Sequence, residues 1–172
     1  KSVWGYHAPI LFPHAGKVVD GIIEVDGKEY PSGQHGFARI SEHTFVEQSA
    51  DTIVLELCAS PETLARFPYE FRLVSTFTLE NDTLHHTLTV ENLDEKKLPF
   101  GIGYHPAFTI PFDDNHVATD YEFRFSEAES PICLNCLPTG LVQKDHYVLG
   151  NNLTTIPIDE QLFANDSHCM CN

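Results

Sequence analysis

The chain is poor in basic side chains: it has 10 Lys and Arg against 25 Asp and Glu, which gives a formal net charge of −15 at pH 7. A field of this sign repels phosphate backbones and anionic lipid surfaces, so nucleic acid and membranes are poor partners. The chain also lacks any apolar run near the about 20 residues that a membrane-spanning helix needs. Neutral small molecules therefore remain as the expected ligands.

Long stretches of helical periodicity are missing as well. The helical candidate 61–67 is about two turns long and is stopped by Pro68. Short alternating or β-branched runs, separated by turn residues, recur instead and predict strands at 18–25, 28–30, 44–48, 52–58, 71–80, 83–91 and 121–125. Hydrophobic residues make up 42% of the chain, enough for a sizeable core. We predict an all-β antiparallel sandwich or barrel, with residues 1–172 forming a single domain.

Five cysteines are present, and an odd number favours free thiols in a reducing compartment, which predicts a cytoplasmic protein. Cys133-x-x-Cys136 and Cys169-x-Cys171 together supply four thiols, the number that a structural zinc site needs. The second spacing is unusual for zinc. Free thiols and a zinc site both stay open at this point.

Two histidines stand in the most informative contexts. His35 lies in Gln-His-Gly-Phe-Ala-Arg (34–39) and His105 lies in Gly-Tyr-His-Pro-Ala-Phe (103–108). Glycine lets a ligand approach the backbone closely, and aromatic rings can line a pocket. Imidazole can give or take a proton near neutral pH. The two histidines are candidates for acid or base catalysis, and the alternative is a structural role beside turns.

These two blocks occur in series with Leu-Phe-Pro (11–13) and Phe-Pro-Tyr-Glu-Phe (67–71). In this order and spacing they resemble the aldose 1-epimerase (galactose mutarotase-like) family, and the resemblance runs from about residue 3 to 166. It implies an antiparallel β-supersandwich and an isomerase that interconverts the α and β anomers of free aldohexoses by acid/base ring opening. It implies a small-molecule sugar as partner, and neither a cofactor nor a metal.

The resemblance also assigns roles to single residues. His105 matches the acid that protonates the sugar's ring oxygen, and His35 matches a histidine that assists at the same edge of the sugar. Lys17 falls near an arginine that holds sugar hydroxyls, but lysine lacks its bidentate geometry. Arg39 is the alternative cation, with a strand-edge salt bridge as its other possible role. His14, beside the proline-rich segment, is a weaker candidate to reach the pocket.

The C-terminal part of the resemblance is less complete. Asp166 matches a substrate-binding aspartate, with Asp159 as its rival, and both could instead be turn-forming residues. The family's general-base glutamate and its opening strands before Trp4 find no counterpart in the sequence. We therefore expect these 172 residues to be an incomplete portion of the supersandwich, with the base in the remainder of a longer protein.

Two other functions fit the same fold. The first is a non-catalytic carbohydrate-binding protein, because fold does not fix function. The second is a hexose-6-phosphate mutarotase, which needs an arginine cluster for its phosphate. The chain has only four arginines and a strongly negative charge, which favours neutral aldoses.

Overall fold

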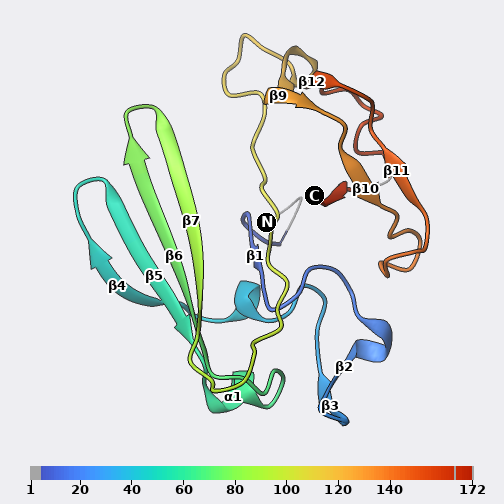
Figure 1. The fold of residues 1–172 in the computed structure, drawn as a ribbon. Helices are drawn as coiled ribbons and strands as arrows, with labels where there is room; N and C mark the ends of the chain where they lie inside the picture. The colour runs from blue at the N-terminus through green and yellow to red at the C-terminus, as the bar shows by residue number, and fades with distance from the viewer. Residues whose placement is uncertain (1–4, 165, 172) are drawn as a thin grey trace. The chain divides into compact units, whose positions relative to one another are not determined.

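The computed structural model describes residues 5–164 and 166–171. The chain divides into two compact units, Lys1–Pro106 and Ala107–Asn172, and each is described separately below. Strands dominate the described residues of both units, as Figure 1 shows, so the predicted all-β class is confirmed. The assignment of residues 1–172 to one domain stays a prediction.

The first unit is built on a four-stranded antiparallel sheet of order β4-β5-β6-β7, a hairpin of β2 and β3, and the short pair β1-β8. The strands are β1 Ile10–Leu11, β2 Ile22–Val25, β3 Lys28–Pro31, β4 Thr44–Gln48, β5 Thr52–Cys58, β6 Phe71–Glu80, β7 Thr83–Asn92 and β8 Gly103–Tyr104. The helix α1 spans Pro61–Leu64, and the 3-10 turns η1 and η2 span Val19–Gly21 and Ala38–Ile40.

The faces of the four-stranded sheet follow from the alternation of side chains along β6. Phe71, Leu73 and Ser75 are buried on one face. On the other face Arg72 donates hydrogen bonds to Glu56 of β5 at 2.6 Å and Glu91 of β7 at 3.0 Å. Opposite charges on adjacent strands therefore bridge the outer face, and the apolar face forms the core.

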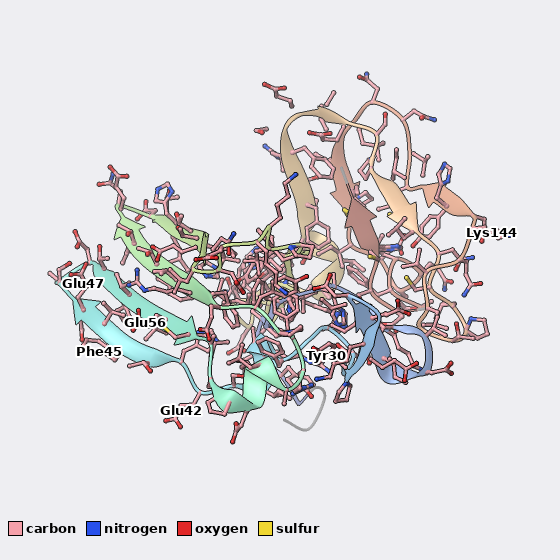
Figure 2. All side chains as sticks on the ribbon, turned by 60° about the horizontal axis from the view of Figure 1, so that its bottom comes forward. Tyr30, Glu42, Phe45, Glu47, Glu56 and Lys144 are labelled. Carbon is pink, nitrogen blue, oxygen red and sulfur yellow. The ribbon has the colours of Figure 1, made fainter. Side chains whose placement is uncertain are left out.

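The sheet ends at β4, which is an edge strand with all five side chains exposed. Phe45 and Glu47 of this strand are labelled in Figure 2, which draws the side chains. A charged residue on an exposed edge disfavours pairing with another chain.

The hairpin of β2 and β3 turns at Asp26 and Gly27, as the sequence predicts, and both residues have positive φ angles, of 52° and 75°. This conformation suits a two-residue hairpin turn. The expected strand over 18–25 is wrong in its first half. Asp20 and Gly21 also have positive φ, which interrupts the extended backbone and forms the turn η1 instead.

Helix α1 is shorter than the expected 61–67. Its first turn is well capped: the Ser60 hydroxyl accepts from the Thr63 N–H, the Thr63 hydroxyl accepts from the Ser60 N–H, and Pro61 follows the cap. The α-helix nevertheless ends at Leu64. A helix this short has little intrinsic stability and depends on the packing around it.

An aromatic cluster forms the core of the first unit. The Phe12 ring is fully buried, with its centroid 5.1 Å from that of Phe71 and 6.1 Å from those of Phe37 and Phe67. Aromatic pairs at these distances add to the stabilisation from burial. Three of the sequence blocks that carry the family resemblance therefore meet in one core.

The second unit contains two smaller antiparallel sheets, of order β9-β12 and β11-β10-β13. Their strands are β9 Glu122–Glu129, β10 Ile132–Leu134, β11 His146–Val148, β12 Leu153–Pro157 and β13 Cys169–Cys171, and the turn η3 spans Ala118–Asp120. The strand expected at 121–125 corresponds to β9, which begins one residue later than predicted and continues to Glu129. Among the described residues there is no helix with the length and apolarity to cross a membrane.

Candidate functional site

One segment near the N-terminus supports the loops of both candidate histidines. Strand β1 pairs with β8, and the Pro9 carbonyl accepts a hydrogen bond from the His105 N–H at 3.2 Å. Further along, the Phe12 carbonyl accepts from the N–H groups of Phe37 and Ala38 at 2.9 and 3.2 Å. The backbone of residues 9–12 thus fixes two loops that are far apart in the sequence.

Two hydrogen bonds with Gly16 fix the position of His35. Its N–H donates to the Gly16 carbonyl at 2.7 Å, and the Gly16 N–H donates to the His35 Nδ1 at 2.9 Å. We call this reciprocal pair of bonds the Gly16–His35 clasp. His35 has a φ of 64°, which is uncommon for a residue other than glycine. The clasp stabilises this conformation and orients the imidazole.

The imidazoles of His35 and His105 lie together in the first unit. Their ring centroids are 6.3 Å apart and their planes meet at 89°. Burial, together with the nearby Arg39, His105 and His14, lowers the pKa of His35 to about 4. His35 is therefore neutral at pH 7, beside a second imidazole. This pair can hold a proton on one ring and offer a neutral hydrogen-bonding group on the other.

His14 belongs to the same neighbourhood. Its Nε2 lies 2.6 Å from the Ser32 hydroxyl, and its Nδ1 is buried with no hydrogen-bond partner among the described residues. Burial lowers the pKa of His14, and a protonated His14 would in turn lower the pKa of His35. His14 is thus a neutral neighbour of the pair at pH 7.

The two predicted cations differ in their surroundings. Arg39 stacks its guanidinium over the Tyr6 ring, 4.4 Å from the centroid, and its Nε is buried with no hydrogen-bond partner in the described part of the chain. The positive charge of Arg39 also lowers the pKa of His35, so Arg39 lies near the histidine pair. Lys17 is exposed and directly follows Gly16 of the clasp.

Arg39 lines a groove of about 390 Å³ in the first unit. Aromatic rings form part of its wall: His86 stacks on Phe77 at 4.0 Å, and Tyr104 lies edge-on to His86 at 5.3 Å. The His86 Nε2 is 2.8 Å from the buried Ser75 hydroxyl. No sequence motif singles out this aromatic group. Only the alternation of side chains along β6 and β7 indicates this group in the sequence, because it places residues 75, 77 and 86 on one face of the sheet.

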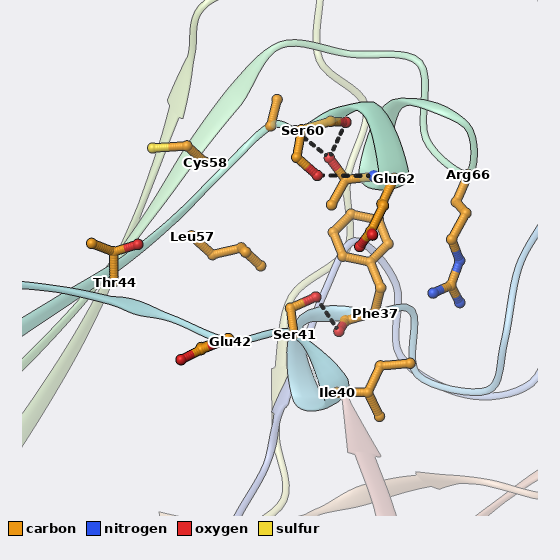
Figure 3. Close-up of a pocket in the computed structure, with 12 residues that line it drawn as sticks. Phe37, Ile40, Ser41, Glu42, Thr44, Leu57, Cys58, Ser60, Glu62 and Arg66 are labelled. Atoms are coloured by element: carbon orange, nitrogen blue, oxygen red, sulfur yellow. Dashed lines mark hydrogen bonds between the residues drawn. The ribbon is translucent and has the colours of Figure 1, made fainter.

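A second groove, of about 520 Å³, lies between η2, β5 and α1 (Figure 3). Its polar lining includes Glu42, Glu62 and Arg66, and the Arg66 guanidinium lies 5.7 Å from the centroid of the Phe37 ring. The lining contains none of the site residues that the sequence predicts. This groove is distinct in its residues from the histidine pair.

The predicted aspartates lie in the second unit, where each caps a turn. The Asp166 carboxylate accepts from the Ser167 N–H at 2.7 Å, and the Asp159 carboxylate accepts from the N–H groups of Gln161 and Leu162, both at 2.8 Å. These are the turn-forming contacts that the sequence analysis allows. A sugar-binding role for Asp166 stays a prediction.

The cysteine motifs also lie in the second unit. Cys133 is buried in β10, and Cys136 carries a free thiol. Among the described residues, no group of three or more His, Cys, Asp or Glu side chains is arranged to hold a metal ion. The side chain of Cys171, the fourth thiol of the zinc hypothesis, lies outside the described residues.

Most of the chain matches one known protein family. A family model described as aldose 1-epimerase matches residues 1–160. The chain belongs to the aldose 1-epimerase family. The resemblance drawn from the four sequence blocks is therefore confirmed.

Relatives in this family are similar along nearly the whole chain. Protein LacX, chromosomal, of Lactococcus lactis subsp. lactis is 31% identical over 172 residues, which cover 95% of this chain and 58% of the relative. The plasmid form of LacX from the same organism is also 31% identical over the same shares. The chain thus spans less than two thirds of the length of these curated relatives.

Solved structures agree on the fold. A galactose mutarotase related enzyme from Lactobacillus acidophilus superposes with a TM-score of 0.84 at 27% identity, over 96% of this chain and 55% of that one. A galactose mutarotase-like protein from Lactobacillus casei ATCC 334 gives 0.83 at 28% identity, over 98% and 58%. The predicted galactose mutarotase-like fold is confirmed.

Proposed function

We propose that the protein is an aldose 1-epimerase that interconverts the α and β anomers of free aldohexoses. Family membership supports a mutarotase at the coarse level. The observation that carries the finer proposal is the pairing of the His35 and His105 rings at 6.3 Å within one unit. Two imidazoles at this separation can engage one edge of a sugar ring together.

The reaction needs one proton to be given and one to be taken. A base removes the proton of the anomeric hydroxyl while His105 donates a proton to the ring oxygen, and the bond between C1 and the ring oxygen breaks. The open-chain aldehyde rotates about its C1–C2 bond. Reclosure reverses both proton transfers, so acid and base regain their starting states and no cofactor is consumed.

The predicted substrate-binding residues are proposed to bind the sugar hydroxyls. Arg39, whose guanidinium lies over the Tyr6 ring, and Lys17, beside the clasp, are the proposed cations in the first unit. The general base is proposed to be a glutamate that is not among these 172 residues. Hydrogen-bonded hydroxyls orient the anomeric carbon for the two proton transfers.

The test is mutarotation followed by polarimetry on the full-length protein, with freshly dissolved α-D-glucose or α-D-galactose. Wild type should accelerate the approach to equilibrium, and His105→Ala should abolish the acceleration. His85→Ala is the matched control, because His85 is an exposed histidine on β7 whose imidazole faces Glu80 at 3.6 Å. Sugar binding without any acceleration would contradict the proposal and favour the non-catalytic carbohydrate-binding alternative.

A further inference from the structure

We propose that the main chain of Gly16 fixes His35 in the neutral tautomer that carries its proton on Nε2, so that His35 donates a hydrogen bond to the sugar's ring oxygen and never supplies the catalytic proton. Gly16 is then a positioning residue for the reaction. This inference rests on the proposed function and gives the two histidines different roles. His105 donates the catalytic proton, and His35 donates only a hydrogen bond.

The clasp determines the tautomer. A backbone N–H can only donate, so the Nδ1 atom that receives the Gly16 N–H at 2.9 Å must present a lone pair. A neutral imidazole carries its proton on the other nitrogen. The second bond of the clasp, from the His35 N–H to the Gly16 carbonyl at 2.7 Å, holds the two residues in register.

One contact competes with this assignment. The Gln34 amide nitrogen lies 3.4 Å from the His35 Nε2. If this nitrogen donated to Nε2, both ring nitrogens would be acceptors, which a neutral imidazole does not allow. The Gly16 bond is 0.5 Å shorter than the Gln34 contact and its donor is unambiguous, whereas the ends of an amide side chain can be exchanged. The Gly16 bond therefore decides the tautomer.

Protonation of His35 would undo the clasp. A proton on Nδ1 would face the Gly16 N–H, so two donors would oppose each other across 2.9 Å. The positive charge of the nearby Arg39 disfavours a further charge on the ring. The lowered pKa of His35 agrees with this geometry.

A fixed Nε2–H restricts what His35 can bind. It can donate but cannot accept, and it suits an oxygen that needs a donor. Every hydroxyl of an aldohexose can itself donate, whereas the ring oxygen carries no hydrogen and can only accept. His35 is thus matched to the ring oxygen, where it steadies the atom to which His105 delivers the proton.

The direct test is the ionisation state of His35 in the full-length, ¹⁵N-labelled protein, read from long-range ¹H–¹⁵N correlation spectra of the imidazoles. We expect an unprotonated Nδ1 and a protonated Nε2, unchanged from pH 8 to pH 5.5. A proton on Nδ1, a mixture of tautomers, or titration near pH 6.5 would overturn the proposal. This measurement does not depend on catalysis, so the clasp and the proposed activity fail separately.

A matched pair of glycine variants tests the role of Gly16. Gly16 and Gly27 have φ angles of 84° and 75°, and a Cβ on either would meet nothing within 4 Å. Gly16→Ala and Gly27→Ala therefore introduce similar backbone strain, but only the first disturbs the clasp. We expect the second tautomer of His35 to appear in Gly16→Ala and not in Gly27→Ala. An unchanged tautomer in Gly16→Ala would mean that another contact fixes the ring, which would refute the role of Gly16.

Two substitutions of His35 connect the tautomer with catalysis. The amide nitrogen of Gln can occupy the place of Nε2, whereas that of Asn reaches only the level of Nδ1. His35→Asn should lower kcat for mutarotation by about 100-fold or more, the usual loss for a donor at a developing charge. His35→Gln should lose clearly less and should keep the acid limb of the pH profile. Equal losses in the two variants, or a changed acid limb in His35→Gln, would contradict the role as a donor.

Discussion

Gly36 lies so close to the main chain of Phe12 that a Cβ atom on Gly36 would stand 2.5 Å from the Phe12 carbonyl carbon. The two residues form an isolated parallel bridge. The carbonyl oxygen of Phe12 accepts from the next two N–H groups after Gly36. This contact joins the aromatic core directly to the loop that carries His35, so the position of the imidazole depends on it.

Gly36→Ala should destabilise the protein by about 2–5 kcal/mol, because the new methyl group clashes with backbone atoms and the φ of 68° is unfavourable for alanine. Urea unfolding measures the change. Gly27→Ala is the control, since it has a similar φ and open space around its Cβ. It should cost only the conformational penalty of about 1–2 kcal/mol. Equal losses in both variants would show that the Gly36–Phe12 contact is not tight in solution.

The central sheet could be predicted from the sequence because its signals are local. Alternation over 71–80, the turn at Asn81 and the return over 83–91 predict β6 and β7 to within one residue. Strand β9 was less predictable, because its length depends on pairing with β12, more than twenty residues away. The local sequence pattern does not indicate a partner strand at that distance. Strand β9 therefore extends to Glu129, beyond the predicted end at residue 125.

The stability of the protein should rise with pH between about 4 and 6.5 through His35. Burial lowers the pKa of His35 from 6.5 to about 4, so the unfolded chain binds more protons in this window. The stabilisation is complete above pH 6.5 and is lost as the pH falls towards 4. At about 1.36 kcal/mol per pKa unit, the shift sets an upper bound of about 3 kcal/mol, and solvent screening of the half-buried imidazole reduces the effect to about 1–2 kcal/mol.

The control for this pH dependence is His35→Gln, because His14 and His86 also have pKa values that burial lowers. Unfolding free energies of wild type and variant at pH 4.5, 5.5 and 7.5 isolate the contribution of His35. The difference between the two proteins should grow in favour of wild type as the pH rises. A difference that does not change with pH would show that His35 titrates normally.

Phe12→Ala should destabilise the first unit by about 3–5 kcal/mol, because it removes a fully buried ring from the centre of the aromatic cluster. Urea unfolding followed by tyrosine fluorescence or circular dichroism measures the loss. Phe45→Ala is the matched control, since the Phe45 ring is 57% exposed on the edge strand, and it should cost less than about 1 kcal/mol. Similar losses would place Phe12 outside the core.

The candidate site was only partly predictable. The identity of His35 and His105 as partners came from the family resemblance, and the structure places their rings side by side. The clasp could not be foreseen, because it needs a positive φ at His35, which residues other than glycine rarely adopt. Gly16 is an ordinary loop glycine in the sequence, and only the fold brings its N–H to an imidazole nineteen positions away.

Glucose 6-phosphate should be no better a substrate than glucose. Of the four arginines, Arg72 is engaged by Glu56 and Glu91, and Arg124 is engaged by Glu122. A phosphate dianion would thus find no free cluster of guanidinium groups within residues 5–164 and 166–171, and it would be opposed by a net charge of −15. Values of kcat/KM for the two sugars, measured by NMR exchange between anomers, test this expectation. A strong preference for the phosphate would favour the hexose-6-phosphate alternative.

Arg39→Gln distinguishes the two substrate classes at one residue. If Arg39 binds sugar hydroxyls, kcat/KM should fall by a similar factor for glucose and glucose 6-phosphate, because both present the same hydroxyls there. If Arg39 binds a phosphate, the loss should be confined to glucose 6-phosphate and should shrink at high salt, since ions screen the interaction. We expect the first result, because the Arg39 guanidinium is held over the Tyr6 ring, 4.4 Å from its centroid, and a net charge of −15 opposes the binding of a dianion.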